Sequence, residues 1–273
     1  PCFGTGVVQI CTYGDKEDVK TVIKHKLPVI RLLTENGKIS EAGCKYSGLY
    51  VNQARAAIVA DLTAAGLIEK TEKIQQEVGV CDRCKAQVEI LEVKQWFMRT
   101  LPLCEAVEKS ANEIPWYPDY MKNRLIDWTR ALDWDWVVSR QRLFATPIPV
   151  WYCKRCGEVI VAQESWVPID PRMEKPRIEK CPKCTGTEFM GETDVLDTWM
   201  DSSITCAVHA GWPDRADWKH LFPASIHPSG TDIIRTWAYY LMVRHLALFD
   251  ERPFNSVLIN GMVLGADGRK MSK

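Results

Sequence analysis

The sequence has no excess of charge of either sign. Its 35 Lys and Arg residues are balanced by 35 Asp and Glu residues. The overall charge therefore does not indicate a nucleic-acid partner, and any contact with a polyanion must rest on a local patch. The chain also lacks an apolar run near the roughly 18–20 residues of a membrane-spanning helix, and it shows no secretory signal. These absences argue against a membrane-spanning or secreted protein and indicate the cytoplasm.

Histidine is scarce, with five residues, whereas tryptophan and cysteine each occur 11 times. An odd number of cysteines does not suit a framework of disulfides, and Cys-x-x-Cys spacing suits metal thiolates better than disulfides. Three such pairs occur, at Cys81/Cys84, Cys153/Cys156 and Cys181/Cys184.

The strongest chemical signal is the pattern Cys153-x2-Cys156-x24-Cys181-x2-Cys184. Four thiolates in two tight turns predict a closed, tetrahedral structural zinc site. A module of this size has too little apolar core to fold alone, so we expect the metal to supply folding free energy. The alternative is a set of reduced, buried cysteines that bind no metal.

Cys81 and Cys84 make only half of such a site, because no further Cys-x-x-Cys pair remains in the sequence. The two missing ligands lie either upstream of Pro1 or in single cysteines such as Cys44 and Cys104. We favour ligands outside this sequence.

Hydrophobic patterning predicts an α/β chain. Asp15 and Asn52 have the chemistry of helix N-caps and would each begin a helix in the N-terminal part. Residues 28–33 and 254–260 are typical of strands, and residues 232–247 of a long amphipathic helix.

The sequence closes with an apolar strand and a glycine-bearing loop. The loop carries three cations, Arg269, Lys270 and Lys273. Such a loop can close over a polyphosphate and neutralise charge that develops on phosphoryl oxygens. From charge alone, an exposed basic turn is the simpler interpretation.

The order of residues in this loop resembles a known family. Lys270-Met271-Ser272-Lys273 is similar to the second signature of the class I aminoacyl-tRNA synthetases. Three further segments resemble the valine, isoleucine and leucine subgroup of that family. They are Asp197-x-Trp199-x-x-Ser202, Gly230-Thr231-Asp232 with Trp237, and Ser139-Arg140-Gln141-Arg142 followed by Pro147-Ile148-Pro149.

The N-terminal part agrees with this resemblance. Gly14-Asp15-x-x-Asp18 resembles the end of the editing domain inserted in this subgroup, and the form of residues 11–15 is most like archaeal-type valyl members. Ser229 stands where isoleucine members carry an acidic residue. The family's other signature, His-x-Gly-His, is absent. We therefore expect an internal fragment of a longer enzyme, inactive in aminoacylation by itself.

The resemblance implies the C-terminal part of a Rossmann-like α/β catalytic domain, a zinc ribbon and the C-terminal part of an editing domain. The expected boundaries are 1–78 for the editing domain, 79–100 for a connector with the cysteine half-site, 101–152 for re-entry into the catalytic domain, 153–184 for the zinc ribbon, and 185–273 for the second half of the nucleotide-binding domain.

The resemblance also implies a function. The intact protein would be a cytoplasmic, monomeric ligase that activates valine with ATP and Mg, transfers it to tRNA(Val) and edits mischarged threonine. Lys270 and Lys273 would be catalytic, because they stabilise the charge that develops when the amino-acid carboxylate attacks the α-phosphate. Gly230 and Asp232, with both lysines, would bind ATP.

Two further pairs of residues receive roles from the resemblance. Trp199 and Trp237 would wall the amino-acid pocket, whereas core packing is the plainer interpretation of two tryptophans. Asp15 and Asp18 would serve the editing pocket, whereas a helix-capping pair is the alternative. Editing has a physical reason, because an apolar pocket for valine cannot strongly reject its near-isostere threonine.

Other interpretations remain open. An isoleucyl- or leucyl-tRNA synthetase fragment would share most of these motifs. A non-catalytic zinc-ribbon protein that binds nucleic acid is a different class, but the balanced charge does not favour it. A separate editing hydrolase would leave residues 190–273 unexplained.

Overall fold

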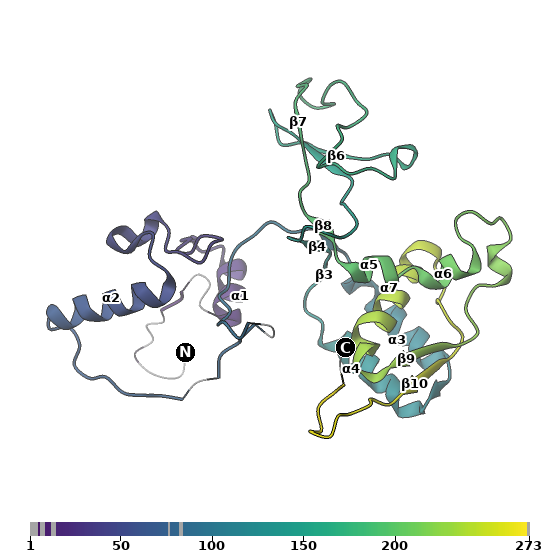
Figure 1. Cartoon of the computed structure of the whole chain (residues 1–273), viewed down its shortest axis with the longest axis horizontal. Helices are drawn as coiled ribbons and strands as arrows, with labels where there is room; N and C mark the ends of the chain where they lie inside the picture. Colours follow the sequence, from purple (N-terminus) through teal and green to yellow (C-terminus); the bar gives the residue numbers. More distant parts are fainter. Residues whose placement is uncertain (1–4, 6–8, 12–14, 76, 82–83, 272–273) are drawn as a thin grey trace. The chain divides into compact units, whose positions relative to one another are not determined.

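The computed structural model describes residues 5, 9–11, 15–75, 77–81 and 84–271. The chain divides into two compact units, Pro1–Lys94 and Gln95–Lys273. The first runs from purple to blue in Figure 1, and the second from teal to yellow. Within the described residues, no helix combines the length and the apolar character needed to cross a membrane.

The first helix of the N-terminal unit, α1 (Lys16–His25), begins as predicted. The carboxylate of Asp15 accepts hydrogen bonds from the backbone N–H groups of Glu17 and Asp18, which would otherwise lack partners at the helix start. The helix ends at Lys26, which adopts a left-handed conformation with φ of 52°.

The second helix, α2 (Val51–Ala64), begins earlier than expected. Tyr50 is its N-cap, and the N–H of Tyr50 donates to the side chain of Gln53. Asn52 lies inside the first turn, so the prediction that it caps the helix is wrong. Residues 28–33 form no regular strand either, because only the last of them makes an isolated bridge.

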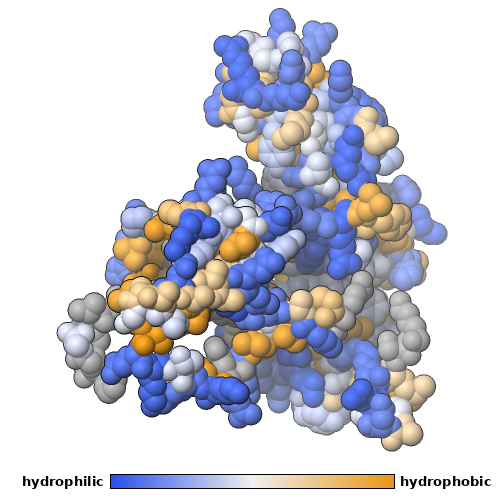
Figure 2. Space-filling model, turned by 60° about the vertical axis from the view of Figure 1, so that its left-hand side comes forward, coloured by the Kyte–Doolittle hydropathy of each residue, from blue (hydrophilic) through white to orange (hydrophobic). Residues whose placement is uncertain are grey.

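Little of the N-terminal unit is buried. Its buried hydrophobic residues, among those described, are Val22, Ile39 and Ala54. Leu67 and Ile74 are 72% and 79% exposed. Figure 2, in which this unit comes forward, shows hydrophobic residues among hydrophilic ones on its surface. A core of this size offsets little of the conformational entropy lost on folding.

A parallel three-stranded sheet of order β2-β10-β9 organises the C-terminal unit. β9 (His227–Gly230) pairs along its whole length with β10 (Val257–Asn260), and β2 (Trp116–Tyr117) pairs with the other side of β10. β10 is shorter than the strand predicted over 254–260. Because the strands are parallel, their carboxyl ends lie at one edge of the sheet, where ligands of α/β proteins commonly bind.

Three helices pack with this sheet around the main core (Figure 1). They are α3 (Cys104–Glu113), α4 (Lys122–Ala131) and α7 (Tyr239–Phe249). The core cluster draws on all of these elements, so burial of apolar surface fixes the sheet against the helices. Its fully buried members include Val107, Ala111, Leu125, Ile234, Tyr239, Leu241, Met242, Val243, Phe254 and Val257.

The segment predicted as one helix over 232–247 is helical but irregular. A 3₁₀ turn over Thr231–Ile233 leads into a π-helical turn over Ile234–Ala238, and α7 follows directly. A π turn changes the direction in which its side chains point and occurs often at functional sites. Here it carries Trp237.

The cysteine-rich module is a small antiparallel sheet. β5 (Val150–Cys153) is its central strand, between β6 (Val159–Val161) and β7 (Phe189–Gly191). The chain enters and leaves through β4 (Ser139–Arg140) and β8 (Val195–Leu196), which pair with each other and form the stem of the module. β6 and β7 are labelled at the top of Figure 1, and β8 and β4 below them.

Short elements complete the described fold. They are β1 (Phe97–Met98), β3 (Trp136–Val137), α5 (Thr198–Ser202) and α6 (Thr205–Ala210), with 3₁₀ segments at Glu41–Tyr46, Leu101–Leu103, Asp119–Met121, Glu164–Trp166 and Trp218–His220.

Candidate functional site

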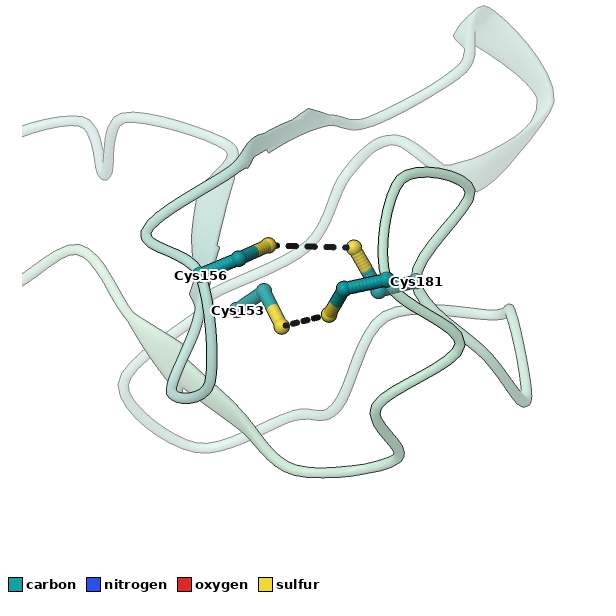
Figure 3. A group of neighbouring side chains, drawn as sticks. Cys153, Cys156 and Cys181 are labelled. Atoms are coloured by element: carbon teal, nitrogen blue, oxygen red, sulfur yellow. Dashed lines mark hydrogen bonds between the residues drawn. The ribbon is translucent and has the colours of Figure 1, made fainter.

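The structure brings the four cysteines of the predicted metal site together, and Figure 3 labels three of them, Cys153, Cys156 and Cys181. The Sγ atoms of Cys153 and Cys184 are 3.5 Å apart, those of Cys156 and Cys181 are 3.7 Å apart, and all four lie within 4.8 Å of one another. Four sulfurs about 2.3 Å from a central zinc would lie roughly 3.8 Å apart in a tetrahedron. The donor set and its spacing therefore fit zinc.

Each cysteine pair lies in a tight backbone turn. The N–H of Cys153 donates to the carbonyl of Glu158 at 2.9 Å, and the N–H of Gly157 donates back to Cys153 at 2.8 Å. Gly157 has φ of 71°, a conformation that glycine adopts without strain. The second pair repeats this pattern, with bonds from Cys181 N–H to Gly186 and back from Thr185 N–H.

The two cysteines of the first pair differ as acids. Burial would raise the pKa of Cys153, but N–H groups of Cys156 and Arg155 point at its sulfur and lower the pKa to about 7. The N–H of Glu158 lowers the pKa of Cys156, yet the neighbouring sulfurs and burial outweigh it and raise that pKa to about 12. Four thiolates this close repel one another, so a bound cation is needed to hold all of them ionised.

The half-site at Cys81 and Cys84 lies in a backbone turn of the same kind as the other two pairs. The N–H of Cys81 donates to the carbonyl of Ala86 at 2.8 Å, and the N–H of Lys85 donates back to Cys81 at 2.8 Å, with φ of 60° at Lys85. Within the described residues, however, no group of three or more potential metal ligands includes this pair. Neither Cys44 nor Cys104 is brought into such a group, and Asp82 and Arg83 lie outside the described residues.

The carboxyl edge of the parallel sheet gathers three of the predicted ATP-binding residues. Gly230 ends β9 opposite Asn260, which ends β10. Asp232 follows in the next turn, and the loop after β10 folds back so that Lys270 forms an ion pair with Asp232. The hydrogen bond from Lys270 lowers the pKa of Asp232 below its usual range. A side chain at Gly230 would put its Cβ 2.8 Å from Oδ1 of Asp232, so glycine leaves room for this carboxylate.

The signature loop itself is a short hairpin. Leu264 and Lys270 form an antiparallel bridge, and the N–H of Gly265 donates to the carbonyl of Arg269 at 2.8 Å. Gly268 closes the turn with φ of 72°. Lys273, the other predicted catalytic lysine, lies outside the described residues.

The two predicted pocket tryptophans both attach to α5. Trp199 lies in its first turn and lines a cavity of about 290 Å³, together with Arg140, Arg142, Ala145, Leu196, Asp197 and Thr198. Trp237 donates from Nε1 to the carbonyl of Ser202 at 3.2 Å, at the other end of α5. It also packs against the main core and edge-on to His227, so it does not line the same cavity.

The predicted editing pair has local partners in the N-terminal unit. Asp15 caps α1, and Oδ2 of Asp18 accepts a hydrogen bond from the N–H of Cys11 at 3.1 Å. These contacts agree with the capping interpretation and leave the editing role a prediction.

Comparison with known proteins decides the family. The model for "tRNA synthetases class I (I, L, M and V)" matches residues 14–273. The chain belongs to this family. It is 54% identical over 273 residues to the valine–tRNA ligases of Methanopyrus kandleri and Methanosarcina barkeri, and all of the chain is covered in both. It spans 30% and 31% of the length of these two relatives. A solved methionyl-tRNA synthetase of Mycobacterium tuberculosis with methionyl-adenylate is 20% identical, with a TM-score of 0.43 over 72% of this chain and 31% of that one.

Within this synthetase chain, sequence reasoning missed the partners of Asp197. Trp136 and Arg140 both donate to its carboxylate, although 57 or more positions separate them from it in the sequence. The signal that could have pointed to them is physical, because a carboxylate in an apolar context needs cationic or N–H partners. Which partners it finds depends on the pairing of β4 with β8.

Proposed function

We propose that this chain is the segment of a valine–tRNA ligase that contains the second, C-terminal half of the nucleotide-binding site. The observation that carries the proposal is the convergence of Gly230, Asp232 and Lys270 at the carboxyl edge of the sheet, in a member of the class I family. Valine is favoured because the similar proteins named above are valine–tRNA ligases. The runner-up is an isoleucine- or leucine-specific member.

The proposed chemistry is adenylate formation. A carboxylate oxygen of valine attacks the α-phosphorus of ATP, a new P–O bond forms, and the bond to pyrophosphate breaks. Negative charge grows on the phosphoryl oxygens, and Lys270 with Lys273 would stabilise it. Asp232 would accept hydrogen bonds from the ribose hydroxyls, and Mg would enter bound to ATP.

The amino-acid side and the correction step complete the proposed cycle. Trp199 would wall the space for the valine side chain from the first turn of α5, and Trp237 would shape that space from the other end of the helix, through its hydrogen bond to Ser202. The aminoacyl group would then pass to tRNA(Val). Asp15 and Asp18 would act in an editing domain that removes threonine, of which residues 1–78 would be the C-terminal part, because the pocket itself cannot reject threonine strongly.

We also propose zinc as the structural metal of a ribbon over residues 153–184. The spacing of the sulfurs and the repeated backbone turn support it. Cys81 and Cys84 would be half of a second site within the connector, residues 79–100, with ligands from another part of the full-length protein. Thiolate ligands require a reducing environment, which supports the cytoplasm. We propose that the full-length ligase acts as a monomer.

Valine-dependent exchange of pyrophosphate into ATP tests the proposal. Full-length enzyme that contains this segment should exchange with valine much faster than with isoleucine or leucine, and threonine should support slower exchange. The 273-residue chain alone, as a matched control, should show none. Preference for isoleucine or leucine would replace valine by the runner-up, and exchange with no amino acid would overturn the function.

A further inference from the structure

The carboxylate of Asp197 is buried, with 6% of the residue exposed, and three donors converge on it. Oδ2 accepts from Nη2 of Arg140 at 2.5 Å and from Nε1 of Trp136 at 3.2 Å. Oδ1 accepts from the N–H of Trp199 at 3.1 Å and thereby caps α5. A buried charge is stable only with such compensation, so the three donors and the carboxylate form one unit.

The two side-chain donors are themselves fixed. Nη1 of Arg140 donates to the carbonyls of Val137 and Ser139, at 2.7 and 2.8 Å. These two bonds to β3 and β4 fix the orientation of the guanidinium, whose Nη2 then points at Asp197. The indole of Trp136 is stacked on Tyr240, with ring centroids 3.8 Å apart and planes at 13°. Each donor therefore has contacts that hold it in place independently of Asp197.

Helix α5 is too short to hold its position through its own hydrogen bonds. Its far end is anchored by Nε1 of Trp237, which donates to the carbonyl of Ser202, and its middle by Nη1 of Arg244, which donates to the carbonyl of Met200 at 3.1 Å. Its near end is anchored by Asp197. Trp199 therefore faces the 290 Å³ cavity from a helix that is clamped at both ends.

We infer that Asp197 is a positioning residue for recognition of the amino-acid side chain. Trp136 and Arg140 hold the carboxylate of Asp197 in place. That carboxylate caps α5 and so sets the position of the indole of Trp199. This inference rests on the proposed role of Trp199 in valine activation. Asp197 also lines this cavity, but the inference assigns its effect to the position of Trp199 and not to a contact with substrate.

The decisive variant is Asp197→Asn, which keeps an oxygen to cap α5 but sets an amide N–H against the donors of Arg140 and Trp136. Asp201→Asn is the matched control, because Asp201 is an exposed carboxylate on the same helix. It accepts a hydrogen bond from Oγ1 of Thr146 and makes none of the contacts of Asp197. Both are prepared with fluorotryptophan in the 273-residue chain, and Trp199→Phe assigns the Trp199 signal. We expect the ¹⁹F resonance of Trp199 to shift or broaden in Asp197→Asn and to stay in Asp201→Asn.

The same substitutions in full-length enzyme test the consequence for activity. For Asp197→Asn we expect KM for valine to rise about tenfold, with KM for ATP and kcat within about twofold, because an oriented charged hydrogen bond is lost but the phosphate site is untouched. Trp136→Phe keeps the stacking and removes one donor, so it should raise KM for valine in the same direction by less. This second variant decides the matter if Asp197→Asn does not fold.

Two results would overturn the inference: an unmoved Trp199 resonance, or a KM for valine equal to that of the Asp201→Asn control. Absence of valine-dependent exchange in the unsubstituted full-length enzyme would instead remove the proposed function. In that case the ¹⁹F measurement still decides whether Asp197 sets the position of Trp199.

Discussion

Lys270 and Asp232 form an ion pair that joins the loop after β10 to the turn after β9. The two residues belong to different loops at the same edge of the sheet, and 38 positions separate them. Both are predicted to contact ATP, and in this structure they contact each other. Nucleotide that binds Asp232 through its ribose would therefore displace Lys270 toward the phosphates.

We expect the ion pair between Lys270 and Asp232 to restrict the motion of the signature loop. Asp232→Asn should release Lys270 and speed tryptic cleavage after Lys270 in the 273-residue chain by up to about fivefold, because an exposed pair of this kind contributes at most about 1 kcal/mol. Asp267→Asn is the control, since Asp267 pairs with Arg269 inside the hairpin. Mass spectrometry of timed digests measures the rate, and equal rates in the two variants would show that the pair does not hold the loop.

The free energy of unfolding should decrease as the pH is lowered, because His245 is buried in its neutral form. The buried ring donates from Nδ1 to the carbonyl of Leu241, and its Nε2 accepts from the N–H of Ala207. Burial lowers the pKa of His245 to about 4, from the usual 6.5. The neutral form is favoured in the folded state, so its contribution is complete above pH 6.5 and is lost as pH falls from 6.5 to 4.

The size of the His245 effect should be on the order of 2–3 kcal/mol at pH 4. Urea unfolding of the 273-residue chain between pH 7 and 4 measures it. His245→Gln should be less stable at pH 7 but should lose less stability on acidification. His227, whose pKa burial also lowers to about 4, remains in both proteins and does not affect the difference. Parallel pH curves for the two proteins would contradict the assignment.

Removal of one sulfur ligand should empty the proposed zinc site. Cys181→Ser should reduce zinc to well below one ion per chain and expose the amides of β5, β6 and β7 to hydrogen exchange, because the metal supplies folding free energy to this module. Cys206→Ser is the control, since Cys206 lies outside the cysteine cluster. Metal analysis with exchange mass spectrometry provides both readouts. Full zinc in Cys181→Ser would rule out the four-cysteine site.

The N-terminal unit should not fold alone. With Val22, Ile39 and Ala54 as its buried hydrophobic residues among those described, it has too little core to balance its chain entropy. A polypeptide of residues 1–94 should show the narrow amide dispersion of an unfolded chain in an NMR spectrum. A polypeptide of residues 95–273, which contains the main core, should show dispersed signals with zinc present. A folded 1–94 polypeptide would be contrary to this expectation.

Sequence reasoning succeeded where chemistry is local. The cysteine spacing located the four sulfurs, and Asp15 was recognised as a cap from its own side chain. It failed where geometry depends on distant neighbours. The N-cap of α2 is Tyr50 because the side chain of Gln53 accepts a hydrogen bond from its N–H. The π turn around Trp237 does not change the spacing of hydrophobic residues in the sequence, so it could not be predicted. The donors to Asp197 were invisible because strand pairing, not sequence distance, brings them close.

The stem of the cysteine module also bears on how such a chain can change. Arg140 lies opposite Val195, so the module leaves and returns through neighbouring residues of one ladder. Insertions, deletions or a replacement module between β5 and β7 therefore leave Arg140 beside Asp197, provided the ladder keeps its register. The module is a site at which evolution or protein engineering can alter length and surface without moving Arg140 and Asp197 in the wall of the 290 Å³ cavity.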